Sequence, residues 1–175
     1  MKIGIPKDYL KNVDPEIKTI LEKSIKEFEN LGAIAEEIEL PLTEYCMDVY
    51  YIIAPSEASS NLSRYDGVKY GHRSSTDENS RASLVDSRSE GFGDEVKRRI
   101  MIGTYTLSAG YYDAYYKKAQ QIRTLIVEEF ENAFKKFDVL LAPTSPTTAF
   151  KINEKTNDPI KMYQSDLCTI PVNIA

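Results

Sequence analysis

The first 42 residues switch from strand to helix to strand, and this order limits the folds that the chain can adopt. Residues 2–6 favour a short strand that ends at Pro6, and Asp14 followed by Pro15 is typical of a helix start. Gly32 is suited to end the helix in a left-handed conformation, and residues 33–40 favour a second strand. Between these points, apolar side chains recur at steps of three and four: Ile17, Ile20, Leu21, Ile25, Phe28 and Leu31. The pattern predicts a βαβ unit, and therefore a parallel sheet in an α/β fold.

The middle of the chain, residues 43–137, is predicted to be mainly helical. A helix is expected over residues 43–62, with Pro55 kinking or interrupting it because proline removes one backbone donor. Residues 63–86 are polar and predict a mobile loop, which would border an active site in a larger enzyme or be a plain surface loop. Two further helices are expected over residues 94–107 and 111–137.

After the helical region, residues 138–142 predict a buried strand that ends at a proline. A polar loop and one helical turn at residues 162–165 follow. We therefore expect one domain over residues 1–175. It would consist of a βαβ unit (1–42), a helical region (43–137) and a strand with a C-terminal segment (138–175).

Composition excludes several classes of function. The net charge of −5 argues against a nucleic-acid-binding surface on this chain alone, and no apolar run is long enough to cross a membrane. Cys46 and Cys168 are too few and too far apart for a disulfide framework or a metal site, so we expect buried thiols. A Ser-His-Asp triad on the sole histidine, His72, stays open as an alternative. The sequence thus predicts a cytoplasmic protein without metal or cofactor.

The run SEGFGDEVKRRI at residues 89–100 carries the strongest chemical signal. A glycine-rich turn leads into a helix with two adjacent arginines, Arg98 and Arg99. A guanidinium can hold a carboxylate with two parallel hydrogen bonds, so these residues alone indicate a small anionic ligand. The following run, GYYDAYYKKAQ at 110–120, places Tyr111, Tyr112, Tyr115 and Tyr116 at i, i+4 spacing. Because the local charge is mixed, we expect packing or a subunit contact there instead of RNA stacking.

Together with IGIPK at 3–7, APSEASSNLSRYDG at 54–67, LLAPT at 140–144 and SDLCTIPVN at 165–173, these runs resemble the amidase-signature family. The resemblance covers nearly the whole chain and is strongest to the branch of glutamyl-tRNA(Gln) amidotransferase A subunits. It implies part of the amidase-signature fold, a mixed sheet flanked by helices. It also implies a C-terminal portion that lacks the family's catalytic serine, second serine and lysine. We therefore expect no catalytic residue in the chain, and no activity from it alone.

Three residues match the glutamine-binding positions of that branch. Arg99 would bind the α-carboxylate of glutamine, and Asp166 would face its α-ammonium group. Tyr50 would provide a hydroxyl and an aromatic wall. Each has an alternative: Arg99 could be a surface residue, Asp166 a helix-end acid or a cap, and Tyr50 a packing residue. Arg98 also competes with Arg99, because neighbouring residues on a helix point about 100° apart.

The resemblance further implies that the intact enzyme hydrolyses glutamine and uses the ammonia to convert glutamyl-tRNA(Gln) to glutaminyl-tRNA(Gln). The expected partners are the B and C subunits and the tRNA, with ATP and Mg²⁺ on the B subunit. No phosphate-binding GxxxxGK[ST] motif is present in this chain. Two other functions stay open: part of another amidase that acts on a different amide, and a noncatalytic helical module that docks onto partner subunits.

Overall fold

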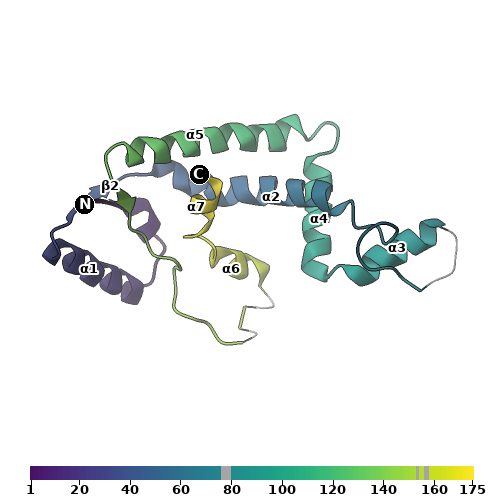
Figure 1. Cartoon of the computed structure of the whole chain (residues 1–175), viewed down its shortest axis with the longest axis horizontal. Helices are drawn as coiled ribbons and strands as arrows, with labels where there is room; N and C mark the ends of the chain where they lie inside the picture. Colours follow the sequence, from purple (N-terminus) through teal and green to yellow (C-terminus); the bar gives the residue numbers. More distant parts are fainter. Residues whose placement is uncertain (76–79, 153, 156–157) are drawn as a thin grey trace. The chain divides into compact units, whose positions relative to one another are not determined.

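The computed structural model describes residues 1–75, 80–152, 154–155 and 158–175. Their contacts group into two units, Met1–Val49 with Gln121–Ala175, and Tyr50–Gln120. The first unit holds a small parallel sheet and the second is helical (Figure 1). This mixture confirms the predicted α/β class, while the single domain over residues 1–175 stays a prediction.

The sheet of the first unit has three parallel strands in the order β2-β1-β3. Strand β1 (Lys2–Pro6) pairs with β2 (Ile34–Ile38) through the register Ile3↔Ala35, and with β3 (Val139–Leu140) through Ile3↔Val139. Every β1 residue after the first is buried, as expected for a central strand covered on both faces. In Figure 1, α1 (Pro15–Asn30) lies below the strands and the C-terminal part of α5 (Lys118–Phe134) lies above them.

The connection from β1 to β2 confirms the predicted βαβ unit. Helix α1 begins at Pro15, with Asp14 at its N-cap position. Gly32 has a φ of +88°, and the amide of Ala33 donates to the carbonyl of Phe28 at 3.0 Å, which closes the helix in the predicted left-handed turn. The Asp14 side chain makes no capping hydrogen bond; its backbone amide donates to the Pro146 carbonyl at 2.9 Å instead.

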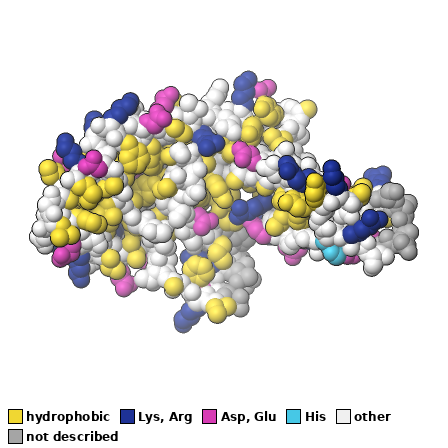
Figure 2. Space-filling model, viewed as in Figure 1, with side chains coloured by type: hydrophobic (Ala, Val, Ile, Leu, Met, Phe, Trp, Pro, Cys, Tyr) yellow, Lys and Arg dark blue, Asp and Glu magenta, His cyan; other side chains and the backbone are white. Residues whose placement is uncertain are grey.

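The expectation of a buried strand at residues 138–142 was wrong in extent and in burial. Only Val139 and Leu140 pair with β1, and Val139 is 39% exposed. The reason is its position: β3 is an edge strand with a single neighbour in the described residues. Figure 2 shows hydrophobic side chains gathered over the first unit, where several large apolar residues are exposed. They include Leu31, Ile34, Leu125, Phe134 and Val139.

The C-terminal segment packs into the first unit through two short helices, α6 (Pro159–Gln164) and α7 (Ile170–Ile174). The Nε of Arg123 on α5 donates to the carbonyl of Ile174 at 2.9 Å, and Ile170 is buried. The prediction of buried thiols is confirmed, because Cys46 and Cys168 are 1% and 2% exposed.

Asp8 connects the 3-10 helix η1 (Lys7–Leu10) to the segment after β2. Its Oδ2 accepts the amide of Leu40 at 2.7 Å and its Oδ1 pairs with Lys11 at 2.8 Å. Partial burial raises the pKa of the Asp8 carboxyl, but the hydrogen bonds from Lys11 and Leu40 outweigh this and hold that pKa below its ordinary value of 3.8. The ionised carboxylate therefore stabilises the first unit.

Asp8→Ala is expected to lower the free energy of unfolding by about 2 kcal/mol at pH 7, because the Leu40 amide loses a charged acceptor. A lowered folded-state pKa contributes stability above the unfolded pKa and loses it as pH falls through the folded pKa. The difference from the native chain should therefore shrink below pH 3.8 in urea unfolding series. Asp14→Ala is the control, since that exposed side chain makes no cap bond. Equal effects of the two variants would contradict the role of Asp8.

The second unit contains most of α2 (Cys46–Leu62), together with α3 (Ser80–Gly91), α4 (Asp94–Thr106) and a π-helical turn η3 (Asp113–Lys117). The predicted helix over 94–107 is confirmed, and that over 111–137 corresponds to η3 and α5. The helix predicted over 43–62 begins later, at Cys46, after the 3-10 helix η2 (Pro41–Tyr45). Helix α2 continues through Pro55, so the expected interruption is absent from it.

The predicted loop over residues 63–86 was also wrong at its C-terminal end, because α3 begins at Ser80. The helix is held by tertiary contacts that the polar sequence does not reveal. Nη1 of Arg88 donates to the carbonyls of Leu62 and Tyr65 at 3.0 and 2.9 Å, and its guanidinium lies 5.0 Å from the ring of Phe92. The centre of the predicted mobile loop, residues 76–79, lies outside the described residues.

Candidate functional site

Helices α2 and α4 approach each other closely within the second unit, and Gly103 makes this possible. A Cβ atom at Gly103 would lie 2.0 Å from the carbonyl oxygen of Pro55. Next to this contact, the hydroxyls of Ser56 and Thr106 are 2.6 Å apart and both side chains are buried. The absence of a side chain at position 103 and the hydroxyl pair together fix how α2 lies against α4.

About one helical turn before that crossing, Tyr50 on α2 meets Arg99 on α4. Nη1 of Arg99 donates to the hydroxyl of Tyr50 at 3.5 Å, a long hydrogen bond. The guanidinium carbon of Arg99 lies 6.0 Å from the ring centre of Tyr51, and the rings of Tyr50 and Tyr51 pack edge to face at 5.1 Å. Two of the three predicted site residues, 49 positions apart in sequence, are therefore in contact.

The side chains of Arg99 and its neighbour Arg98 have different environments. The Arg99 side chain is 31% exposed and reaches α2, whereas the Arg98 side chain is 50% exposed. Both arginines also bind Glu95, one turn earlier on α4, and Nε of Arg99 lies 3.0 Å from Oε1 of Glu95. Partial burial lowers the pKa of Arg99, but its hydrogen bonds to Glu95 and Tyr50 outweigh burial and raise that pKa above the ordinary value. Arg99 is thus a fixed cation.

Asp166 lies in the first unit, just beyond α6. Its backbone carbonyl accepts the amide of Ile170 at 2.9 Å, where α7 begins. The Asp166 side chain is exposed, and among the described residues it makes no hydrogen bond or ion pair. Its backbone therefore shapes the turn into α7 while its carboxylate is available to a ligand. A pocket shared by Asp166, Tyr50 and Arg99 stays a prediction.

Part of the segment EASSN at residues 57–61 lines a cavity that the sequence did not predict. Ser59 contacts α4 instead, since its hydroxyl lies 2.9 Å from that of Thr104. The cavity, of about 230 Å³, is lined by Ser56, Glu57, Ser60, Asn61, Leu107 and Tyr116. Glu95 was missed as well, although its position four residues before Arg99 on a predicted helix could have indicated the contact.

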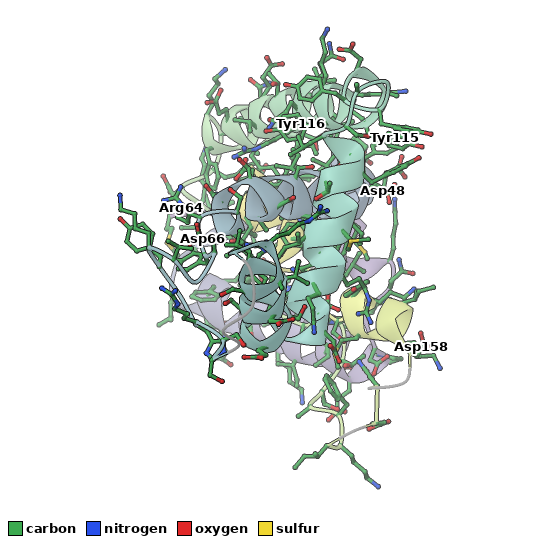
Figure 3. The ribbon with its side chains drawn as sticks, turned by 90° about the vertical axis from the view of Figure 1, so that its right-hand side faces the viewer. Asp48, Arg64, Asp66, Tyr115, Tyr116 and Asp158 are labelled. Carbon is green, nitrogen blue, oxygen red and sulfur yellow. The ribbon has the colours of Figure 1, made fainter. Side chains whose placement is uncertain are left out.

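The tyrosines at the C-terminal end of α4 and in the segment after it form two clusters. Tyr105, Tyr111 and Tyr115 pack with ring centres 4.3 to 6.1 Å apart, and Tyr112 packs on Tyr116 at 5.3 Å. Figure 3 shows Tyr115 and Tyr116 on the segment that leads into α5, and Arg64 and Asp66 in the turn after α2. A hydrogen bond with Tyr111 raises the pKa of Tyr105 to about 12. These contacts favour the packing interpretation of the aromatic run.

The geometry supports neither a catalytic triad on His72 nor a metal site among the described residues. Both Nε2 of His72 and the hydroxyl of Ser74 bind the carboxylate of Glu90, at 2.7 and 2.9 Å. A triad needs histidine between the serine and the acid, so this order does not activate Ser74. The described residues contain no cluster of three or more His, Cys, Asp or Glu that could hold a metal, and no helix among them is long and apolar enough to cross a membrane.

Comparison with known proteins gives consistent matches over the full length. The Amidase family model matches residues 1–175. The A subunit of glutamyl-tRNA(Gln) amidotransferase from Halothermothrix orenii is 60% identical over 176 residues, which cover 100% of this chain and 37% of that protein. The protein of the same name from Listeria welshimeri is 57% identical and is covered to 36%. This chain therefore spans little more than a third of the length of these relatives.

Solved structures agree with the fold. The crystal structure of the A subunit of glutamyl-tRNA(Gln) amidotransferase from Thermotoga maritima matches 100% of this chain with a TM-score of 0.70 and 39% identity, over 33% of its own length. A crystal structure described as an amidase matches 99% of the chain with a TM-score of 0.71 at 19% identity, and at that identity it supports the fold alone.

Proposed function

The chain belongs to the amidase family, and from this membership we propose that it is the substrate-binding portion of the glutamine-hydrolysing A subunit of a tRNA-dependent amidotransferase. The relatives described above carry that subunit's name, and each of them aligns with the whole of this chain. The chain would be a C-terminal portion of the subunit. The serine nucleophile, the second serine and the lysine would come from the rest of the protein, so the chain alone would not release ammonia.

The contact between Tyr50 and Arg99 is the observation that carries this proposal. A guanidinium has five N–H donors, and Arg99 directs one to Glu95 and one towards Tyr50. The other donors suit a planar carboxylate, which a guanidinium binds with two parallel hydrogen bonds. The α-carboxylate of free glutamine has this shape and charge.

In the proposed mechanism, this chain binds and orients glutamine. Arg99 holds the α-carboxylate, Asp166 offers a carboxylate to the α-ammonium, and the Tyr50 ring limits the pocket. Fixing both charged groups would direct the side-chain amide towards the nucleophile, which raises the rate by orientation. The B subunit would use ATP and Mg²⁺ to activate the side-chain carboxylate of glutamyl-tRNA(Gln), and the ammonia would displace the activating group to form the amide. The C subunit would complete the assembly. Because the product is used in translation, we propose the cytoplasm as its location.

A chimera tests this function. Residues 1–175 replace the aligned segment of the full-length Halothermothrix orenii subunit, which is 60% identical to them. We expect the chimera, assembled with that organism's partner subunits, to release ammonia from glutamine, while the 175-residue chain alone does not. The unaltered subunit is the positive control. A folded chimera without glutaminase activity would contradict the proposal.

The same assay separates the two alternative functions. An amidase with a different substrate would hydrolyse an uncharged amide, such as propionamide, better than glutamine. Its pocket would not need a residue that binds an α-carboxylate. A noncatalytic docking module would leave both amides intact and would associate with increasing concentration in analytical ultracentrifugation, as the exposed apolar residues of the first unit permit.

A further inference from the structure

We infer that Glu95 is a positioning residue for glutamine binding, because it holds Arg99 in the orientation that a substrate carboxylate requires. Oε1 of Glu95 accepts from Nε of Arg99 at 3.0 Å, and the Tyr50 hydroxyl accepts from Nη1 at 3.5 Å. This inference rests on the proposed function. It adds to that function a residue that does not touch the substrate and acts through Arg99.

The geometry of the guanidinium explains what Glu95 contributes. A guanidinium can bind a carboxylate through its Nε edge or through its two terminal nitrogens. Glu95 occupies Nε of Arg99 and the Tyr50 hydroxyl takes one N–H of Nη1, so the remaining N–H groups of Nη1 and Nη2 are left for an external carboxylate. Without Glu95, the arginine side chain would sample more rotamers, and binding would have to order it again.

The contact with a second helix also fits this role. Glu95 binds both Arg98 and Arg99. A simple surface pair between residues i and i+4 would need no contact with a second helix, whereas Arg99 also reaches Tyr50 on α2.

The test uses the full-length chimera with Glu95→Ala, Glu95→Gln and the control Asp94→Ala. Asp94 is the other acid in the first turn of α4, so Asp94→Ala removes the same helix-stabilising charge as Glu95→Ala does. Asp94 pairs with Lys97 and not with Arg99. We expect Glu95→Ala to raise KM for glutamine about two- to tenfold with kcat nearly unchanged, since one long side chain must then be ordered on binding. Glu95→Gln should restore most of the affinity, because its amide oxygen can still accept from Nε, and Asp94→Ala should leave KM unchanged.

A second substrate makes the result specific. With the α-amide of glutamine, which has no α-carboxylate, Glu95→Ala should have no effect on KM. If Glu95→Ala does not fold, Glu95→Asp carries the test, because its shorter carboxylate cannot reach Nε and should raise KM for glutamine alone. Equal KM values for Glu95→Ala and Asp94→Ala, with Arg99→Ala still impaired, would overturn the inference and leave the proposed function standing. An unimpaired Arg99→Ala would overturn both.

Discussion

Gly103→Ala is expected to lower the free energy of unfolding by about 2 to 3 kcal/mol, despite the better helix propensity of alanine. The new Cβ would lie 2.0 Å from the Pro55 carbonyl oxygen and 2.5 Å from its carbon. These are backbone atoms of a helix, so they cannot move aside as a flexible side chain can. The two helices must separate, and the buried hydroxyl pair of Ser56 and Thr106 would lengthen or break.

Urea unfolding of the 175-residue chain, followed by circular dichroism, measures this loss. Gly93→Ala is the matched control: it adds the same methyl group at the N-cap of α4, where no atom lies within 4 Å. At this position we expect a change of at most about 1 kcal/mol, since alanine is a poorer N-cap than glycine. A Gly103→Ala chain as stable as the native one would show that α2 and α4 are not in this close contact.

Arg99→Ala in the full-length chimera is expected to raise KM for glutamine about 100-fold. The loss of two charge-assisted hydrogen bonds to a carboxylate corresponds to about 3 kcal/mol. The KM of Arg99→Lys should lie between those of the native and Arg99→Ala proteins, because lysine keeps the charge but cannot form two parallel hydrogen bonds. Lys97→Ala is the control, since Lys97 lies on the same helix and pairs with Asp94.

The readout is ammonia release over a range of glutamine concentrations, with circular dichroism to confirm folding. Uniform loss of substrate binding raises KM with little change in kcat, so the two constants distinguish a binding role from a catalytic one. If Arg99→Ala and Lys97→Ala behaved alike, Arg99 would be a surface residue and would not bind the substrate.

The parts of the fold that the sequence predicted are those set by local pattern. The apolar face of α1 and the left-handed turn at Gly32 are visible in the residue spacing, and together they require β1 and β2 to run parallel. Helix α3 could not be predicted in this way, because Arg88 and its contacts with the carbonyls of Leu62 and Tyr65 hold it in place. The exposure of β3 depends on which strands flank it, and its own sequence does not contain that information.

The sequence likewise predicted only a part of the candidate site. Arg99 and Tyr50 were assigned from residue type and family resemblance, yet their contact depends on the helix crossing at Gly103 and Pro55, which no local pattern encodes. The preference for Arg99 over Arg98 likewise follows from the direction in which α4 faces α2. Glu95 carries a helical i, i+4 signal, but its bond to Nε becomes evident only in three dimensions.

Binding of the α-carboxylate of glutamine by Arg99 is measured by comparing glutamine and its α-amide as substrates of the chimera and of its Arg99→Ala variant. We expect the chimera to prefer glutamine strongly. Arg99→Ala should remove this preference by lowering kcat/KM for glutamine, with kcat/KM for the α-amide unchanged. An equal loss of kcat/KM for both substrates would show instead that Arg99 supports the fold or the reaction without contacting the carboxylate.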